Sequence, residues 1–213
     1  MPRPLIATIH LDAMQQNLAR ARACARGAKV WAVVKANAYG HGLERAMRGF
    51  ADADGLALVE VDYAVRLREL GWSKPILLLE GFFDASDLPV MAQYKLNGSV
   101  HCVEQIAMLE AARLSVKIDV HLKMNTGMNR LGFTPQAVAG AYARLRAIPH
   151  IGTITLMTHF ANADEAGPTR LPLEQQMLRF EAGAASIGAA LPRSLCNSAG
   201  VLMHQLDSDW VRP

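Results

Sequence analysis

The chain has 213 residues, 51% of them hydrophobic, and its 22 Lys and Arg against 19 Asp and Glu give a formal net charge of +3. This length and composition allow one folded domain with a sizeable core and exclude an intrinsically disordered chain. The arginines are scattered through Ala- and Leu-rich segments such as residues 17–26 and 64–70, so we expect no nucleic-acid partner.

The sequence also argues against membrane segments and against sites built on cysteine. No apolar run is long enough to span a bilayer, and Met1–Pro4 is not followed by a signal-peptide core. We therefore expect a cytoplasmic protein with no membrane partner. Cys24, Cys102 and Cys196 are odd in number and widely spaced, which argues against disulfides and a zinc site and predicts buried, reduced thiols.

Strands and helices are predicted to alternate along the whole chain. Leu5–Leu11 alternates loosely and predicts a strand, and Asp12 is expected to cap a helix that ends at Gly27. Further strands are predicted at 30–34, 55–60, 75–80, 98–101, 116–123, 151–159, 193–197 and 210–212. Helices are predicted at 43–51, 61–70, 85–93, 103–113, 135–146, 171–190 and 198–203.

Eight strands joined by helices predict an α/β fold of the (β/α)8 barrel type, because parallel strands need crossover connections. The chain stops on a strand exit at residues 211–213, so the barrel looks truncated at its eighth strand. The helix after that strand would be missing, and we expect apolar barrel surface to be exposed there.

The stretch from Val30 to Gly42 carries the clearest chemical signal. A valine-rich run ends on Lys35, and a polar loop with Tyr39, Gly40 and Gly42 follows. Burying an ammonium is costly unless it is paired, neutralised or covalently used, although a lysine at a strand end can also extend into solvent. The glycines let backbone approach a ligand, and lysine forms a Schiff base with pyridoxal phosphate.

The run from Ala32 to Gly42, Ala-Val-Val-Lys-Ala-Asn-Ala-Tyr-Gly-His-Gly, resembles the cofactor-attachment signature of the alanine racemases residue for residue. The resemblance implies that Lys35 carries pyridoxal 5′-phosphate and that Tyr39 contacts its phosphate. A second run, from Lys123 to Gly132, is also similar to this family. There the resemblance implies that Arg130 bonds the phenolic oxygen of the cofactor and takes part in substrate binding.

Other polar residues also fall where predicted strands end, which is where barrel enzymes hold functional groups. Taken singly, Arg130 could be a loop arginine paired with a carboxylate, and His159 could be an ordinary core histidine. Asn197 and Ser198 start a short helix, where Ser198 is a natural N-cap and backbone amides can hold a phosphate. By resemblance, His159 packs near the pyridine ring, and Asn197 and Ser198 belong to the cofactor site.

Two residues depend most on the resemblance. Arg212, in Trp-Val-Arg-Pro, matches an arginine that faces the pyridine nitrogen and keeps it unprotonated; otherwise it is a strand-end surface arginine. Lys123 matches a lysine that is carbamylated in many members and orients the loop arginine, and an ordinary ammonium is the alternative. A metal site built from His41, His159 and Asp164 has no supporting ligand spacing, so no metal is expected.

The resemblance implies an architecture larger than the barrel. Alanine racemases carry a second, mostly β domain after it, and the first strand of the chain packs into that domain. We expect residues 1–11 to be a strand that would pack on the absent C-terminal β domain, and residues 12–213 to be the pyridoxal-phosphate-binding barrel, incomplete at its C-terminal end. A homodimer is expected for the full-length protein.

The implied activity is interconversion of L-alanine and D-alanine, with D-alanine supplied for peptidoglycan. Lys35 would exchange the α-proton on one face, and a tyrosine of the partner subunit's second domain on the other. That tyrosine has no counterpart here, so we expect little activity from these 213 residues. A non-enzymatic pyridoxal-phosphate-binding homeostasis protein is close in length, but its attachment strand does not continue as Ala-Asn-Ala-Tyr-Gly-His-Gly. The tyrosine–glycine loop argues against the other alternative, a barrel-fold amino-acid decarboxylase.

Overall fold

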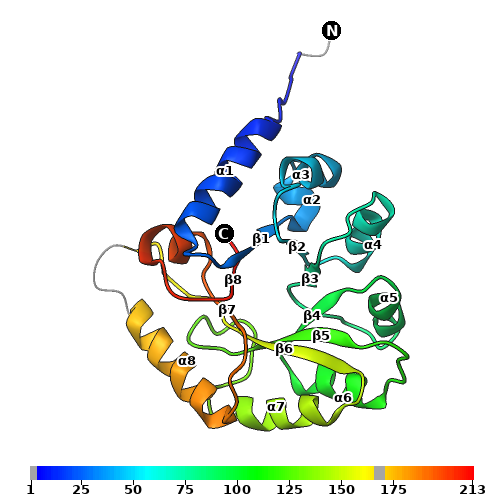
Figure 1. The fold of residues 1–213 in the computed structure, drawn as a ribbon, viewed down its shortest axis with the longest axis vertical. Helices are drawn as coiled ribbons and strands as arrows, with labels where there is room; N and C mark the ends of the chain where they lie inside the picture. The colour runs from blue at the N-terminus through cyan, green and yellow to red at the C-terminus, as the bar shows by residue number, and fades with distance from the viewer. Residues whose placement is uncertain (1–3, 166–170) are drawn as a thin grey trace.

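A computed structural model describes residues 4–165 and 171–213, and within them eight parallel strands close into a barrel (Figure 1). Each strand pairs with the next in sequence order, and β1 pairs with β8. The strands are β1 (Lys29–Val33), β2 (Gly55–Leu58), β3 (Ile76–Leu78), β4 (Asn97–Val100), β5 (Ile118–Lys123), β6 (Ile151–Met157), β7 (Arg193–Ser194) and β8 (Trp210–Val211). This topology confirms the predicted (β/α)8 barrel.

Helices surround the strands and connect each one to the next (Figure 1). They are α1 (Leu11–Cys24), α2 (Lys35–Tyr39), α3 (Leu43–Gly49), α4 (Val61–Glu69), α5 (Asp87–Gln93), α6 (Val103–Ala111), α7 (Val138–Ala147), α8 (Leu173–Ile187) and the π-helix η1 (Gly200–His204). Helical crossovers of this kind are what parallel neighbouring strands require.

Apolar residues fill the barrel from both sides of the sheet. Trp31, Ala57 and Leu77 form a buried cluster that is separate from the larger core of strand and helix residues. Alternate residues of a strand point to opposite faces, so Trp31 and Val33 lie on one face of β1 and Lys35 continues that face beyond its end. Val33 packs against the small cluster, which agrees with the face predicted for Lys35.

The expectation of exposed apolar surface beside the last strand is wrong. Val211, which packs into the larger core from β8, is only 1% exposed. The helix α1 precedes β1 and contacts β1, α3 and η1, so it occupies the outer side of the barrel next to the closure (Figure 1). A helix at the start of the chain therefore takes part in covering the region where a helix after β8 was expected.

The predicted strand at Leu5–Leu11 is also absent from the structure. Residues 4–10 have no regular secondary structure, and Leu5 is 95% exposed. A strand needs a neighbouring strand for its backbone hydrogen bonds, and none lies beside this segment in the described residues. The first helix begins at Leu11 with His10 as its N-cap, so Asp12 lies in the first turn instead of capping it. Packing of residues 1–11 on a second domain stays a prediction.

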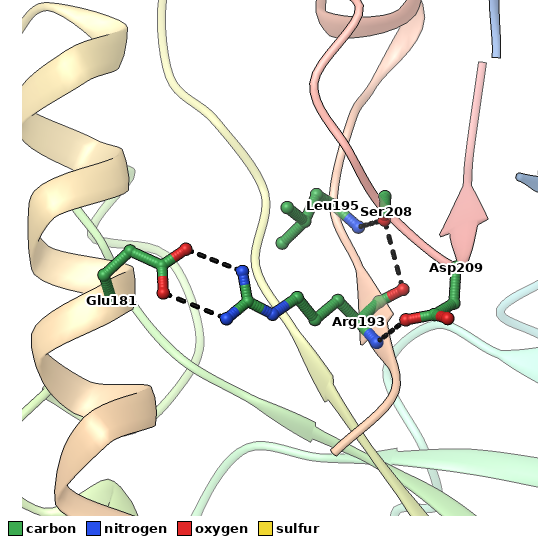
Figure 2. Close-up of polar contacts among 5 residues, drawn as sticks. All are labelled: Glu181, Arg193, Leu195, Ser208 and Asp209. Carbon is green, nitrogen blue, oxygen red and sulfur yellow. Dashed lines mark hydrogen bonds and ion pairs between the residues drawn. The ribbon is translucent and has the colours of Figure 1, made fainter. Parts of the chain in front are cut away.

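The seventh and eighth strands are shorter than predicted, and side chains add to the backbone hydrogen bonds that join them, such as the one from the Leu195 N–H to Trp210 O at 3.1 Å. Figure 2 shows Arg193 paired through both terminal nitrogens with Glu181 of α8, at 2.7 and 3.0 Å. The Arg193 N–H donates to Asp209 Oδ2 at 2.7 Å, and the Leu195 N–H donates to Ser208 Oγ at 3.1 Å. These contacts hold β7 in the barrel wall between α8 and β8.

The cysteine prediction is confirmed in part. All three cysteines are free; Cys24 and Cys196 are buried, whereas Cys102 is half-buried at the start of α6. Across residues 4–165 and 171–213, none of the helices combines the length and the apolar character that crossing a bilayer would require.

Candidate active site

A cavity of about 240 Å³ opens at the carboxyl ends of the barrel strands. Most of its lining follows β1, β3, β5, β6, β7 or β8, as expected for a barrel site. The sequence candidates that line it are Lys35, Tyr39, Lys123, Arg130, His159, Asn197, Ser198 and Arg212. Every candidate residue is therefore brought together in one place.

Lys35 starts a single left-handed helical turn, α2. Ala36, Asn37, Ala38 and Tyr39 have φ angles of 53°, 52°, 54° and 54°. This conformation costs residues with a side chain roughly 1–2 kcal/mol each, because Cβ approaches the following carbonyl oxygen. Strain of this kind persists only where the surroundings hold it in place, and it is concentrated at functional sites.

The two glycines after the turn are needed for its closure. Gly40 and Gly42 have φ angles of 87° and 95°, and their N–H groups donate to Ala36 O at 3.2 Å and Asn37 O at 3.0 Å. The Asn37 side chain accepts a hydrogen bond from the Leu43 N–H at 2.8 Å, which joins the turn to the start of α3. The Gly-His-Gly spacing therefore serves the fold of the loop itself.

Lys35 and Tyr39 lie close together at opposite ends of this turn. Lys35 Nζ is 6.0 Å from the centroid of the Tyr39 ring. Lys35 is half-buried, whereas Tyr39 is 60% exposed at the mouth of the cavity. The turn thus presents an amine and a phenol hydroxyl to the same space.

Arg212 is buried beneath the cavity instead of lying on the surface. It is 5% exposed, its Nη1 donates to Ser194 Oγ at 2.6 Å, and its Nη2 donates to Thr158 O. In the part of the chain that the structure describes, no carboxylate forms an ion pair with it. Burial lowers the pKa of Arg212 to about 10, which still leaves it charged at neutral pH.

Positive charge dominates the cavity. Lys123 is 7% exposed, and burial together with the charges of Arg212 and Arg130 lowers its pKa to about 8. Burial and the same arginines, with the lysines, lower the pKa of His159 to about 3, so this imidazole is neutral near pH 7. Glu80 is the carboxylate in the lining. Two lysines and two arginines around one carboxylate suit an anionic ligand, and an amine among them suits an aldehyde. The residues present therefore fit pyridoxal phosphate.

The N-cap prediction for Ser198 is wrong, because Asn197 takes that role. Asn197 Oδ1 accepts a hydrogen bond from the Gly200 N–H at 3.0 Å, and its Nδ2 donates to Phe160 O at 3.4 Å. Ser198 and Ala199 are α-helical and run directly into the π-helix η1, so Ser198 is the first residue of this helical segment and Asn197 precedes it. Ser198 remains exposed and lines the cavity.

Sequence reasoning missed two glutamates that follow strands. Glu80 comes two residues after β3 and lines the cavity. Glu60 comes two residues after β2, and its Oε1 accepts a hydrogen bond from the Ala36 N–H at 3.0 Å. Both occupy the strand-end positions that drew attention to the other candidates, so the same rule could have found them.

A wider groove of about 1110 Å³ lies at the opposite end of the barrel, where β5 and β6 begin. Both arginines in its lining already have partners. Arg144 forms a bidentate ion pair with Glu110, with Nε–Oε1 and Nη2–Oε2 distances of 2.8 Å each. Arg113 donates hydrogen bonds to the backbone carbonyls of residues 110–112. The smaller cavity at the strand ends is therefore the candidate active site.

The fold and this site define a barrel protein with a strained lysine turn and a cationic cavity. The model of the family described as "Alanine racemase, N-terminal domain" matches residues 9–213, and the chain belongs to this family. It is 58% identical to an alanine racemase of Janthinobacterium sp. (strain Marseille) and 52% identical to one of Ralstonia pickettii (strain 12J), with all of this chain matched in both. The matches cover 59% and 56% of those proteins.

Solved structures agree with this assignment. The biosynthetic alanine racemase from Pseudomonas aeruginosa matches 99% of this chain with a TM-score of 0.90 and 41% identity, over 58% of its own length. The alanine racemase from Acinetobacter baumannii matches 95% of this chain with a TM-score of 0.85 and 32% identity, over 56% of its length. The chain thus spans 56–59% of the length of these four relatives.

Proposed function

We propose that this barrel is the cofactor-binding portion of a pyridoxal-phosphate-dependent alanine racemase, which interconverts L-alanine and D-alanine. The observation that carries the proposal is Lys35, half-buried on a left-handed turn that opens into a cavity lined by Arg130 and Arg212. The names of the matched relatives support alanine as the substrate. They favour this function over a homeostasis protein or a decarboxylase.

Different cavity residues would bind different parts of the cofactor. Lys35 would attach to the aldehyde, Tyr39 and Ser198 would hold the phosphate with backbone near η1, and His159 would lie against the ring. Asn197, which accepts a hydrogen bond from the Gly200 N–H, would hold the start of this helix in place beside the phosphate. When bound, the cofactor supplies the electron sink that makes the α-proton of an amino acid removable.

Lys35 would then move the α-proton at Nζ, removing it or returning it on one face of the substrate. Arg130 would position the phenolic oxygen and the substrate from the loop after β5. Arg212 would present a charged guanidinium to the ring nitrogen and keep that nitrogen unprotonated. Its contacts with Ser194 and Thr158 hold the guanidinium in place without a neutralising carboxylate.

Carbamylation of Lys123 is part of the proposal. A buried lysine with a pKa near 8 has a substantial fraction of neutral amine at mildly alkaline pH, and the neutral amine is the form that adds to carbon dioxide. The product is a carbamate and one released proton. Its negative charge would lie in a cavity that otherwise holds an excess of cations. A carbamate signal from ¹³C-labelled bicarbonate, absent in Lys123→Ala, would test this.

The attachment site is the sharpest test of the proposal. We expect a cofactor absorbance band when pyridoxal phosphate is added to the purified chain, and borohydride reduction followed by peptide mapping should place the label on Lys35. Lys35→Ala should lose the band while folding normally. Label on Lys29, Lys117 or Lys123 in place of Lys35 would contradict the assignment.

The remaining properties concern the whole protein. We propose that it acts as a homodimer in which the partner subunit supplies the second tyrosine base, and that its product serves peptidoglycan synthesis. The cytoplasmic location stays a prediction from the sequence.

A further inference from the structure

Within residues 4–165 and 171–213, Glu60 makes the one side-chain hydrogen bond to the backbone amide that follows the proposed cofactor lysine. Its Oε1 accepts from the Ala36 N–H at 3.0 Å, and its Oε2 accepts from the Val59 N–H at 3.3 Å. Glu60 is half-buried and does not line the cavity. It therefore touches the lysine turn from outside the site.

The Ala36 N–H is one of the amides for which the turn itself supplies no acceptor. The first N–H groups of a helical turn have no acceptor within the turn itself. At the other end of α2, the carbonyls of Ala36 and Asn37 are bonded by Gly40 and Gly42, and the Asn37 side chain binds the start of α3. Glu60 is the matching restraint at the lysine end.

An ordinary role for Glu60 in its own helix is not what the contacts describe. Glu60 is the N-cap residue of α4, yet its side chain makes no capping hydrogen bond to that helix. Both carboxylate oxygens are directed at other amides, one of them in the strained turn. The side chain thus joins the end of β2 to the turn after β1.

We propose that Glu60 is a positioning residue for Lys35 and Tyr39. Its carboxylate accepts a hydrogen bond from the Ala36 N–H and so prevents the left-handed turn from relaxing toward a less strained backbone. This keeps the Lys35 amine and the Tyr39 phenol directed at the cavity. The inference rests on the proposed cofactor function of the site. It adds a residue outside the cavity that sets the geometry of attachment.

Three substitutions separate hydrogen bonding from charge. Glu60→Gln keeps the length and one acceptor oxygen, Glu60→Asp keeps the charge but shortens the reach, and Glu60→Ala removes both. Glu44→Ala is the control, because Glu44 is an exposed glutamate in the first turn of neighbouring α3. All are made in the 213-residue chain, whose folding is followed by thermal melting without cofactor.

The readouts are the affinity for pyridoxal phosphate, the rate of attachment to Lys35, and the affinity for pyridoxine phosphate, which lacks the aldehyde. We expect Glu60→Ala and Glu60→Asp to weaken both affinities and slow attachment by about tenfold, the effect of one lost hydrogen bond to a charged group. In Glu60→Gln, both affinities and the attachment rate should stay within about threefold of wild type. Glu44→Ala should give the same values as wild type. A purely structural role would lower the melting temperature without separating Asp from Gln.

The outcomes distinguish this inference from the proposed function. If the wild-type chain does not attach pyridoxal phosphate at Lys35, the proposed function fails first. If it does, and Glu60→Asp binds and attaches as wild type, the positioning role of Glu60 is overturned. Equal losses in Glu60→Gln and Glu60→Asp would also overturn it. Should Glu60→Ala fail to fold, the Asp and Gln variants still decide.

Discussion

Arg212 Nη1 donates a 2.6 Å hydrogen bond to Ser194 Oγ, so the residue after β8 is fixed to the last residue of β7 directly beneath the cavity. Nη2 is held by Thr158 O in the same way. A guanidinium has five N–H donors, so further donors remain for a ligand above it. The short strands at the barrel closure therefore place a charged group under the candidate site.

Replacing Arg212 should change which reaction the full-length protein performs. In a version extended to the full length of its relatives, we expect Arg212→Glu to lower racemisation roughly 10²–10³-fold, the range typical of losing one preorganised electrostatic group. Transfer of the amino group of alanine to the cofactor, which releases pyruvate, should rise because the ring nitrogen can then be protonated. A lactate-dehydrogenase-coupled assay would measure the pyruvate. Arg212→Lys serves as the charge-conserving control. Wild-type rates of both reactions in Arg212→Glu would show that Arg212 has no role in the chemistry.

The sequence was sufficient for the barrel, and its candidate residues all line one cavity, although Glu80 in the same lining was missed. Regular alternation of apolar strands with helices gave the order of elements, and the rule that functional groups follow strands gave the candidates around the cavity. Both predictions depend on local sequence patterns that do not require knowledge of distant contacts. The exceptions are the segments whose state depends on distant partners.

Three differences show this dependence. Leu5–Leu11 has strand-like alternation, but no neighbouring strand is present to bond it. Ser198 has the residue type of an N-cap, yet the Gly200 N–H donates its hydrogen bond to the Asn197 side chain. The left-handed turn from Ala36 to Tyr39 contradicts local propensity altogether and persists with support from Glu60. None of these could be derived from residue preferences alone.

The free energy of unfolding should fall in acid because of His121. This side chain is fully buried, both its ring nitrogens lack partners in the described chain, and burial lowers its pKa to about 3. The unfolded histidine has a pKa near 6.5, so between about pH 6.5 and 3 the unfolded state binds a proton that the folded state does not. Stability is therefore lost as pH falls through this window, at up to about 1.4 kcal/mol per pH unit for one proton.

Urea denaturation between pH 4.5 and 8 would check this acid dependence. We expect His121→Leu to flatten the acid side of the stability profile and to cost little at pH 7, because it removes two unpaired buried nitrogens at similar volume. His159, with its pKa near 3, should leave a residual slope of the same sign. His10→Gln, at an exposed position, is the control. An unchanged profile in His121→Leu would mean that this histidine is not neutral in the fold.

Arg68 should be among the strongest contributors to stability at the end of the barrel away from the cavity. Its guanidinium donates to the carbonyls of Tyr94 at 2.9 Å, Trp72 at 2.7 Å, Lys74 at 2.6 Å and Lys95 at 3.1 Å. It thereby joins the end of α4, the start of β3 and the connection between α5 and β4. We expect Arg68→Ala to destabilise the fold by about 2–4 kcal/mol.

Arg68→Lys should recover little of that stability, because an ammonium cannot reproduce the planar fork of donors. Chemical denaturation would measure the loss, and pyridoxal phosphate binding below the unfolding transition should be unaffected because none of these carbonyls lines the cavity. A lysine variant as stable as wild type would show that charge alone, and not the four-carbonyl geometry, accounts for the effect.

The last prediction is that these 213 residues bind pyridoxal phosphate weakly and racemise alanine slowly by themselves. Tyr39 is the tyrosine in the cavity lining, and the proposal already uses it at the phosphate. A base for the second face would then have to come from outside the barrel, and lacking one removes a general acid–base contribution of roughly 10²–10⁴-fold. Loss of positioning around the substrate should add to this deficit. The chain is to be assayed with L-alanine by a D-amino-acid-coupled method beside a version extended to the full length of its relatives. Cofactor binding without turnover in the shorter form would support the two-base mechanism, whereas equal turnover in both would contradict it and leave the barrel as a complete catalyst.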